Sequence, residues 1–320
     1  MGVRVAVDLM GSDSTPQDIF EAVQAVNQEL RPDDTLIVVA QHAVLPHLRA
    51  LLRPHDRPIE FITTEESIEM EETPLFAVRR KKNSSMAAGM RLLKESAIDA
   101  FVSTGNTGAL VASAMLHLPM LPQMERPALL VMMPTEKGKV AVLDVGAHIG
   151  AKPEHLFQYA LLGSLYRECL YGEFKPTIGL LNIGVEEQKG TKELQDTYHL
   201  LQETFGERFL GNIEGREVFQ GKVDVLVTDG FTGNVFLKTS EGISTFLGQY
   251  LQTHFDVPQI VSHLYHQFNY SEHPGAFLCG LDGIVIKCHG FSDQKALMNG
   301  IRGAFTLAHS SILPYLKAKL

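Results

Sequence analysis

A glycine-rich loop between an apolar run and a helical pattern is the first stretch of this sequence that is suited to chemistry. Residues 101–110 read FVSTGNTGAL, so small polar residues and two glycines separate the apolar residues on either side. Backbone N–H groups at the end of a strand and the start of a helix can bind an anion. The loop lacks the Gly-Lys-Ser/Thr sequence of nucleotide-binding P-loops. It therefore predicts an anion site of another kind.

Five stretches of the chain share this order of residue types, in which an apolar run is followed by a polar residue, a glycine and a helix start. They are residues 7–16, 102–110, 143–153, 181–191 and 227–235. Open α/β folds bind their ligands where the carboxyl ends of parallel strands meet. The polar residues expected at this edge are Asp8, Asp13, Asn106, Asp144, Asn182, Lys189, Asp229 and Asn234.

Two other interpretations of these loops compete with a ligand site. Gly, Asn and Asp are common in turns and helix caps, so any single loop has a purely structural explanation. Because five loops share the same order of residue types, we favour a ligand site to which the loops contribute together. A hard cation held by Asp8, Asp144 and Asp229 is the second alternative. No spacing fixes the geometry of these three residues, so no metal is predicted.

A run of four cations, residues 79–82, is a separate signal. It lies just before the helical stretch 84–96, where positive charge opposes the helix dipole. A solvated charge run is the ordinary explanation. The unfavourable placement instead favours an anionic partner, for which Arg79 and Lys82 are candidates.

The alternation of short β-branched runs with longer helical patterns predicts the fold class. Apolar runs such as 3–9, 99–103 and 223–230 are separated by helical patterns, which indicates a mainly parallel sheet between two layers of helices. We expect a three-layer α/β/α fold in a single domain over residues 1–320. Residues 240–273 have apolar residues at helical spacing on both sides of Pro258, which predicts a projecting helical hairpin.

Composition excludes several classes of protein. The chain of 320 residues has a net charge of −9, which argues against a nucleic-acid binder and requires a local basic patch for any anionic partner. Its three cysteines have no metal-type spacing and fit a reducing compartment. The start of the sequence does not resemble a signal peptide, and no run reaches the roughly 18 apolar residues of a membrane span. A cytoplasmic protein is expected.

Eight stretches, in order, resemble the signature stretches of the PlsX family of bacterial phosphate acyltransferases. They are VDLMGSDSTP, ETPLFAVRRKKNSSM, STGNTGAL, LDVGAHIGAKPEHL, LNIGVEEQKGTKEL, FLGNIEGREV, VTDGFTGNVFLKTSEG and GLDGIVIKCHGFSDQKA. The resemblance runs from residue 3 to about residue 300. One motif alone is a weak signal, but eight in the same order are specific.

The resemblance implies an enzyme that forms acyl phosphate from acyl-acyl-carrier protein and inorganic phosphate, for phospholipid synthesis. It implies a fold like that of the isocitrate and isopropylmalate dehydrogenases and the phosphotransacetylases, and a homodimer in weak peripheral contact with the inner face of the membrane. Phosphate is itself a nucleophile, so no cofactor is expected. The alternatives are a phosphotransacetylase-like enzyme acting on acyl-CoA and a non-catalytic membrane-associated scaffold.

By resemblance, Lys189 and Asn234 are the expected catalytic residues. The lysine would neutralise phosphate or the tetrahedral oxyanion, and the asparagine would donate to the oxyanion or anchor the carbonyl. A solvated lysine is the structural alternative for Lys189. The expected substrate-binding residues are Asp8, Gly11, Ser12, Ser14, Arg79, Lys82, Ser103, Asn106, Thr107, Asp144, His148, Asn182 and Asp229.

The sequence departs from the family pattern at three places. Ser12 and Ser14 replace a usual glycine and histidine, and His148 replaces a usual asparagine. Residues 273–277 read HPGAF where the family has GGAP. Two outcomes are open: Ser14 and His148 exchange roles, or the activity is weakened or redirected. The matching residues elsewhere argue against an inactive protein.

The expected hairpin differs from the family in charge. The family places membrane contact and carrier-protein binding in this region, usually with several lysines, but here no Lys or Arg lies between Lys238 and Lys287. Attraction to anionic lipid is worth about 1 kcal/mol per basic residue. Four histidines supply this charge only when protonated, below about pH 6.5; they are His254, His263, His266 and His273. Weak, salt-insensitive membrane binding is expected, with packing in the core or dimer interface as the alternative.

Overall fold

The computed structural model describes residues 2–53, 56–172, 175–255, 274–289 and 294–320. The chain forms two compact units. Unit 1 comprises Met1–Met120 and His273–Leu313, and unit 2 comprises Leu121–Glu272 and Pro314–Leu320. Both units are therefore built from two separate pieces of the chain. The single domain over residues 1–320 stays a prediction.

The described residues of unit 1 form six neighbouring strands. In spatial order they are β3 (Glu60–Thr64), β2 (Thr35–Gln41), β1 (Arg4–Asp8), β4 (Ala100–Ser103), β11 (Ile284–Lys287) and β10 (Ala276–Cys279). The first five run parallel and β10 is antiparallel to β11. All residues of β4 and β11 are buried, as expected for strands covered by helices on both faces.

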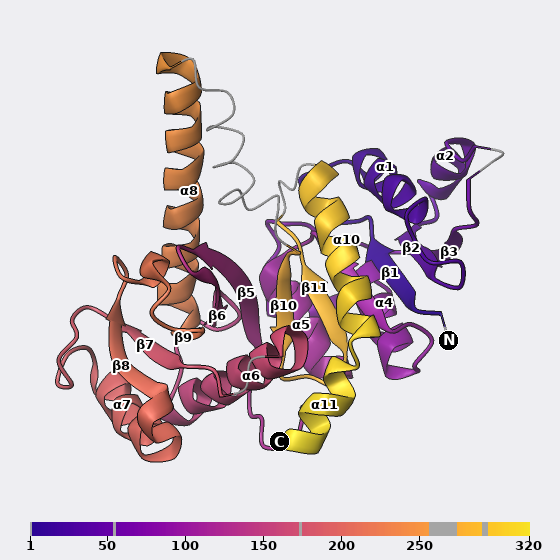
Figure 1. The fold of residues 1–320 in the computed structure, drawn as a ribbon. Coiled ribbons are helices and arrows are strands. Elements are labelled where there is room, and N and C mark those ends of the chain that lie inside the picture. Colours follow the sequence, from indigo (N-terminus) through magenta and orange to yellow (C-terminus); the bar gives the residue numbers. More distant parts are fainter. Residues whose placement is uncertain (1, 54–55, 173–174, 256–273, 290–293) are drawn as a thin grey trace. The chain divides into compact units, whose positions relative to one another are not determined.

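Helices cover both faces of these strands. The helices of unit 1 are α1 (Pro16–Asn27), α2 (Leu45–Ala50), α3 (Pro74–Arg80), α4 (Ser85–Lys94), α5 (Thr107–His117) and α10 (Gln294–His309). Helices α1 and α10 pack on each other on one face, and α4 and α5 pack on each other on the other face (Figure 1). The mainly parallel α/β arrangement expected from the sequence is confirmed.

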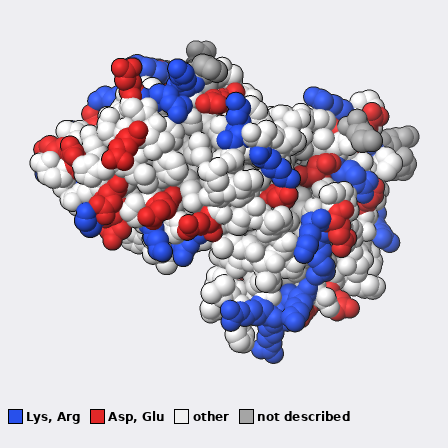
Figure 2. Space-filling view, turned by 90° about the horizontal axis from the view of Figure 1, so that it is seen from below, with Lys and Arg blue, Asp and Glu red and all other residues white. Residues whose placement is uncertain are grey.

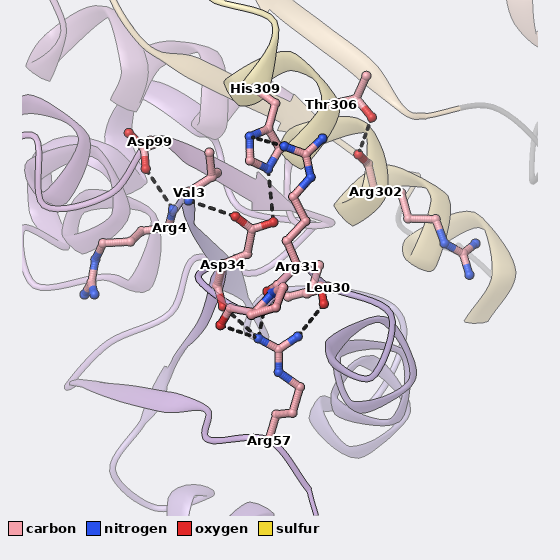
Figure 3. Close-up of polar contacts among 11 residues, drawn as sticks. Val3, Arg4, Leu30, Arg31, Asp34, Arg57, Asp99, Arg302, Thr306 and His309 are labelled. Carbon is pink, nitrogen blue, oxygen red and sulfur yellow. Dashed lines mark hydrogen bonds and ion pairs between the residues drawn. The ribbon is translucent and has the colours of Figure 1, made fainter. Parts of the chain in front are cut away.

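Polar contacts fasten the end of α10 to the first strands of unit 1 (Figure 3). Asp34 accepts hydrogen bonds from the backbone N–H of Val3 at 2.9 Å and from Nε2 of His309 at 3.0 Å. Arg302 donates to both carboxylate oxygens of Glu29, at 2.7 and 2.8 Å. The last long helix of the chain is thus tied to residues near its beginning.

In the part of unit 2 that the structure describes there are five strands. In spatial order they are β5 (Ala128–Thr135), β6 (Gly138–Leu143), β9 (Val225–Val227), β7 (Ile178–Asn182) and β8 (Phe209–Glu214). Strands β5 and β6 form an antiparallel hairpin and the others are parallel. The helices are α6 (Pro153–Tyr171), α7 (Lys192–Phe205) and α8 (Gly230–His254), with short 3-10 turns at Gly206–Arg208 and Val218–Gln220. Helix α11 (Ile312–Lys319) spans the boundary between the two units in the sequence.

Helix α8 occupies the first half of the expected hairpin. It begins at Gly230, ten residues before the expected start at residue 240, and its far end extends away from the strands of unit 2 (Figure 1). Its outer half exposes the apolar residues Ile243, Phe246, Leu247 and Tyr250. Residues 256–273, which would form the second half and include three of the four histidines, lie outside the described residues. No helix among the described residues is both long and apolar enough to cross a membrane.

Candidate functional site

The five predicted loops follow parallel strands, two in unit 1 and three in unit 2. In unit 1 the last residues of β1 and β4, Asp8 and Ser103, lie side by side in register. In unit 2 strand β9 lies between β6 and β7 and is parallel to both. Within each unit, the loops therefore gather at the carboxyl edge of the sheet, which is where ligands bind in such folds.

Asp8 is a buried link between the two loops of unit 1. One carboxylate oxygen accepts the backbone N–H of Met10 at 3.0 Å, and the other accepts the hydroxyl of Ser103 at 3.1 Å. Ser103 Oγ in turn accepts the backbone N–H of Gly105 at 3.2 Å. Burial raises the pKa of Asp8 to about 6. The carboxylate thus holds the loops together from inside the protein.

Asp8→Asn should remove a pH dependence of stability. Because burial raises the pKa of Asp8 from 3.8 to about 6, the native state keeps a proton that the unfolded state releases in this range. The free energy of unfolding of the wild type therefore falls as the pH rises from about 4 to 7, by roughly 3 kcal/mol, and this contribution is level above about pH 7. The amide of the variant has the same shape and does not titrate.

Urea unfolding of both proteins at several pH values checks this expectation. Titrating groups common to both cancel in the difference, so the stability of the wild type relative to the variant should fall between pH 4 and 7. A difference independent of pH would show that Asp8 titrates normally in the native state.

Asn106 caps helix α5 and fixes the loop around it. Its Oδ1 accepts the backbone N–H of Ala109 at 3.0 Å, and its Nδ2 donates to the carbonyls of Met70 and Glu72 at 2.8 and 3.1 Å. Both polar atoms of the Asn106 side chain are therefore engaged in hydrogen bonds within the protein. The backbone N–H groups of Thr107 and Gly108 precede the first intrahelical bonds of α5. These N–H groups, rather than the Asn106 amide, are suited to an anion.

The other predicted residues of the first loop shape the entry to α1. The backbone N–H of Ser14 donates to Oγ of Ser12 at 3.2 Å. Gly11 has φ of +64°, and a side chain there would meet the carbonyl oxygen of Ile68 at 2.0 Å. Ser14 and His148, for which an exchange of roles was considered, belong to unit 1 and unit 2 respectively.

The four cations of residues 79–82 lie at the end of a short helix that the sequence analysis missed. Arg79 and Arg80 form the last turn of α3, where positive charge is favourable, and α4 begins only at Ser85. The expected position of the four cations before helix α4 is thus correct, but Arg79 and Arg80 also belong to the end of α3, where their charge is favourable. Lys81 pairs with Glu72 at 2.5 Å. Arg79, Arg80 and Lys82 are exposed.

Asp144 has a structural role in unit 2. It is completely buried, and its two oxygens accept backbone N–H groups from four residues at 2.8–3.0 Å; these are Leu129, Gly146, Ala147 and His148. Burial raises the pKa of Asp144, and these bonds oppose the rise. The carboxylate therefore holds the turn after β6. No group of three or more His, Cys, Asp or Glu suited to a metal gathers within the described ranges.

Asp229 and the glycines that follow it begin helix α8. Oδ1 of Asp229 accepts the backbone N–H groups of Phe231 and Thr232 at 3.0 and 2.9 Å, as an N-cap. The first turn of α8 presses against the turn after β6. The side chain of Asn234 lies 3.4–3.7 Å from where a Cβ on Gly146 would be, and it makes no hydrogen bond within the described residues. Its amide is available to a ligand.

Asn182 fixes the loop that carries Lys189. Its Nδ2 donates to the carbonyl of Lys189 and to Oδ1 of Asn212, both at 3.1 Å. Asn212 in turn donates to the carbonyl of Glu186 at 2.9 Å. The side chain of Lys189 is 45% exposed and reaches Glu186 only at 4.0 Å. The backbone at Lys189 is thus held while its ammonium group remains accessible.

His148 brings no positive charge to the turn after β6. Burial lowers its pKa to about 4, and Arg126 and His155 add to the effect. Nε2 of the ring is buried without a hydrogen-bond partner in the described part of the chain. At neutral pH this ring is uncharged.

Two residues with a place in these clusters were missed in the sequence. Asn212 lies inside one of the quoted motifs, and Lys287 ends strand β11 beside Ser103. Neither was named as a candidate. The available signal was a polar or charged residue within a run of apolar residues, which a buried strand accommodates only when it has partners.

Comparison with known proteins finds a family and relatives that match nearly the whole chain. The model of the family described as fatty acid synthesis protein matches residues 3–313. A phosphate acyltransferase from Chlamydia caviae is 44% identical over 314 residues, covering 98% of this chain and 97% of the relative. A phosphate acyltransferase from Chlamydia pneumoniae is 42% identical over 317 residues, with the same coverage.

Solved structures show the same fold. A phosphotransacetylase from Streptococcus pyogenes aligns with a TM-score of 0.63 at 16% identity, over 97% of this chain and 94% of that chain. The EutD phosphotransacetylase from Staphylococcus aureus aligns with a TM-score of 0.61 at 17% identity and the same coverage. At this identity the likeness shows the α/β fold alone.

Proposed function

The chain belongs to the fatty acid synthesis protein family, as its resemblance to PlsX predicts, and we propose that it transfers an acyl group from acyl-acyl-carrier protein to inorganic phosphate. Its relatives named phosphate acyltransferases support the reaction type. The proposal rests on which polar side chains of the loops already make hydrogen bonds within the protein and which remain free to bind a ligand. Asn106, Asp144, Asn182 and Asp229 are bound within the protein, whereas the Lys189 ammonium and Asn234 amide remain available.

The proposed chemistry needs no activated side-chain nucleophile. A phosphate oxygen attacks the thioester carbonyl carbon, the C–S bond breaks, and the thiol group leaves on the carrier protein. Negative charge develops on the carbonyl oxygen, where a preorganised donor has its largest effect. Lys189 would neutralise phosphate or this oxyanion, and Asn234 would donate to it.

A hydroxylamine trap for acyl phosphate tests the function on the purified protein. Thioester cleavage should depend on inorganic phosphate and give hydroxamate with an acyl-carrier-protein donor. Acyl-CoA offered in parallel distinguishes the phosphotransacetylase-like alternative. EDTA in a further arm tests the expectation that no metal is required. If neither donor is cleaved, the non-catalytic scaffold would be the better explanation of the protein's function.

Helix α3 supports the choice of an acidic protein as acyl donor. Leu75 and Phe76 are 62% and 63% exposed, and the guanidinium of Arg80 lies 6.0 Å from the centre of the Phe76 ring. Exposed cations beside an apolar pair are suited to docking an acidic partner. The net charge of −9 does not prevent this, because Lys and Arg gather in groups on the face that Figure 2 displays.

Arg79→Glu and Lys82→Glu should raise the KM for acyl-carrier-protein substrate, because each reverses an exposed charge expected to attract it. The effect should be larger at low salt, where screening is weaker. Lys94→Glu is a matched control, since this exposed lysine lies at the end of α4. Steady-state kinetics at two salt concentrations measure the change. An effect confined to the KM for phosphate would place these cations at the acceptor site instead.

The homodimer and the weak peripheral membrane contact also remain proposals. The support for membrane contact is the outer half of α8, whose apolar residues are exposed. Of the four histidines, only His254 belongs to the described part of the chain. Sedimentation with anionic vesicles tests this contact, and analytical ultracentrifugation tests the dimer.

A further inference from the structure

Four large apolar side chains are exposed in the loops at the carboxyl edge of unit 2. Ile149 follows β6 and is 83% exposed, and Phe231 follows β9 and is 62% exposed. Ile183 and Val185 follow β7 and are 81% and 55% exposed. Single exposed apolar side chains are common on protein surfaces, whereas a group of them marks a binding site. Whether these four lie together therefore decides their meaning.

The three loops begin side by side. Strand β9 lies between β6 and β7 and is parallel to both. Val227, which ends β9, is in register with Leu143 at the end of β6 and with Leu180 near the end of β7. Neighbouring strands are about 4.8 Å apart. The exposed apolar residues thus come from adjacent loops on one edge of the sheet.

Close contacts join the loops after β6 and β9. A Cβ on Gly230 would lie 2.2 Å from the carbonyl oxygen of His148. These two residues directly precede Phe231 and Ile149, whose backbones are therefore close together. Phe231 and Asn234 are three residues apart in α8, and side chains at this spacing are neighbours on a helix. The apolar residues of these loops lie beside the amide proposed to bind the thioester carbonyl.

The loop after β7 combines apolar residues with the other proposed catalytic side chain. A Cβ on Gly184 would lie 3.0 and 3.2 Å from Cγ and Cδ of Lys189. The apolar stem of the lysine therefore lies against the glycine between Ile183 and Val185. The ammonium group and the exposed apolar side chains thus belong to one continuous piece of the loop.

The stretches that carry these apolar residues are uncharged. Residues 145–151, 183–185 and 230–237 contain no Asp, Glu, Lys or Arg. Burial lowers the pKa of His148 to about 4, so its ring is uncharged at neutral pH. An acidic protein or an anionic membrane is attracted by groups of cations, which these stretches lack. A hydrocarbon chain is the ligand that matches an apolar, uncharged surface.

We propose that Ile149, Ile183, Val185 and Phe231 bind the acyl chain of the donor and set a preference for long chains over short ones. The inference rests on the proposed function and assigns the acyl-chain site within it. With the thioester carbonyl at Asn234, the chain that begins at this carbonyl lies next to the exposed side chains. Its methylene groups leave water when they cover them, which favours binding.

A double variant removes apolar surface from two of the loops without changing a proposed catalytic residue. It combines Ile183→Ser with Phe231→Ser. Leu210→Ser is the matched control, because Leu210 is an exposed leucine of unit 2 near the amino end of β8. Strand β8 is parallel to β7, so this end lies at the opposite edge of the sheet.

Four measurements compare the variants with the wild type. They are the KM for butyryl- and palmitoyl-carrier protein, the KM for phosphate, the Kd for the fluorescent fatty acid cis-parinaric acid, and Tm. In the wild type the KM for the donor should fall as the chain lengthens, by up to about fourfold for each methylene that is buried.

The double variant should raise the KM for the palmitoyl donor and the Kd for cis-parinaric acid roughly 10-fold, since each lost side chain removes part of its apolar contact. The KM for the butyryl donor should change less than twofold. The KM for phosphate and Tm should not change, because both side chains are exposed. The Leu210→Ser control should match the wild type throughout.

Two results would overturn the inference. Equal increases in the KM for both donors would show that this surface contacts the carrier protein rather than the chain. Unchanged kinetics in the double variant would exclude an acyl-chain site, and a weaker dimer in analytical ultracentrifugation would then assign the surface to contact between copies.

Failure of the proposed function gives a different result. A wild type that forms no acyl phosphate but binds cis-parinaric acid, with weaker binding by the double variant, would contradict the reaction and support the acyl-chain site.

Discussion

Lys189→Ala and Asn234→Ala should each lower turnover by about 10²–10³-fold while the protein remains folded. The Lys189 side chain is accessible to a ligand, and the half-buried Asn234 side chain makes no hydrogen bond within the described residues. Lys189 is 45% exposed on its side chain, with Glu186 at 4.0 Å as its ion-pair partner. Removing either should therefore affect the transition state much more than the folded state, because exposed side chains away from special contacts contribute little to stability.

Matched substitutions nearby make this prediction specific. Lys192→Ala removes an exposed lysine at the start of α7, and Val235→Ala truncates the exposed neighbour of Asn234. Both should retain turnover within a few-fold of the wild type. Hydroxamate formation measures turnover, and circular dichroism during heating measures Tm. If Lys189→Ala or Asn234→Ala retains near wild-type turnover, that residue loses its catalytic assignment.

Gly233→Ala should destabilise unit 2 by about 3 kcal/mol or prevent folding, at the upper end of the usual cost of overpacking. A Cβ at this position would lie 1.9 Å from the carbonyl oxygen of Asp144. That carbonyl has little freedom to move, because the N–H of Asp144 donates to Thr228 at 2.9 Å and its carboxylate holds the following turn. The helix must shift instead, which would also displace Asn234.

Gly242→Ala in the same helix is the matched control. Apart from the backbone of its own helix, no atom of the described residues lies within 4 Å of its Cβ position, so the substitution should leave stability unchanged or raise it by up to about 1 kcal/mol, since alanine favours helix. Urea unfolding monitored by circular dichroism measures both variants. A cost below 1 kcal/mol for Gly233→Ala would mean that the contact between α8 and the turn after β6 is loose.

Local sequence patterns predicted the helices and strands better than they predicted which strands pair with each other. Alternation of apolar runs and helical patterns correctly predicted parallel strands covered by helices. Helix α3 was missed because its seven residues are too few to show a period, although Pro74 in its first turn was a start signal. The pairing of β4 with β11 could not be predicted, because residues far apart in the chain form it.

The sequence predicted that the polar loops follow the strands, but not which hydrogen bonds their side chains make. The polar residues do gather after the strands, as the shared loop pattern indicated. That Asp144 binds four backbone N–H groups depends on carbonyl and amide positions that no side-chain pattern encodes. The catalytic and substrate-binding roles themselves stay predictions.

The two-piece construction of unit 1 has a consequence for its synthesis on the ribosome. Strand β4 ends at Ser103, whereas its neighbour β11 begins at Ile284 and α10 follows at Gln294. About 180 residues separate the two strands, so roughly 10–35 s of translation at 5–20 residues per second passes before β11 emerges. During this time one edge of β4 and the face of β1 that α10 covers are without their partners. The nascent chain should therefore depend on chaperones most strongly while the middle of the sequence is being made.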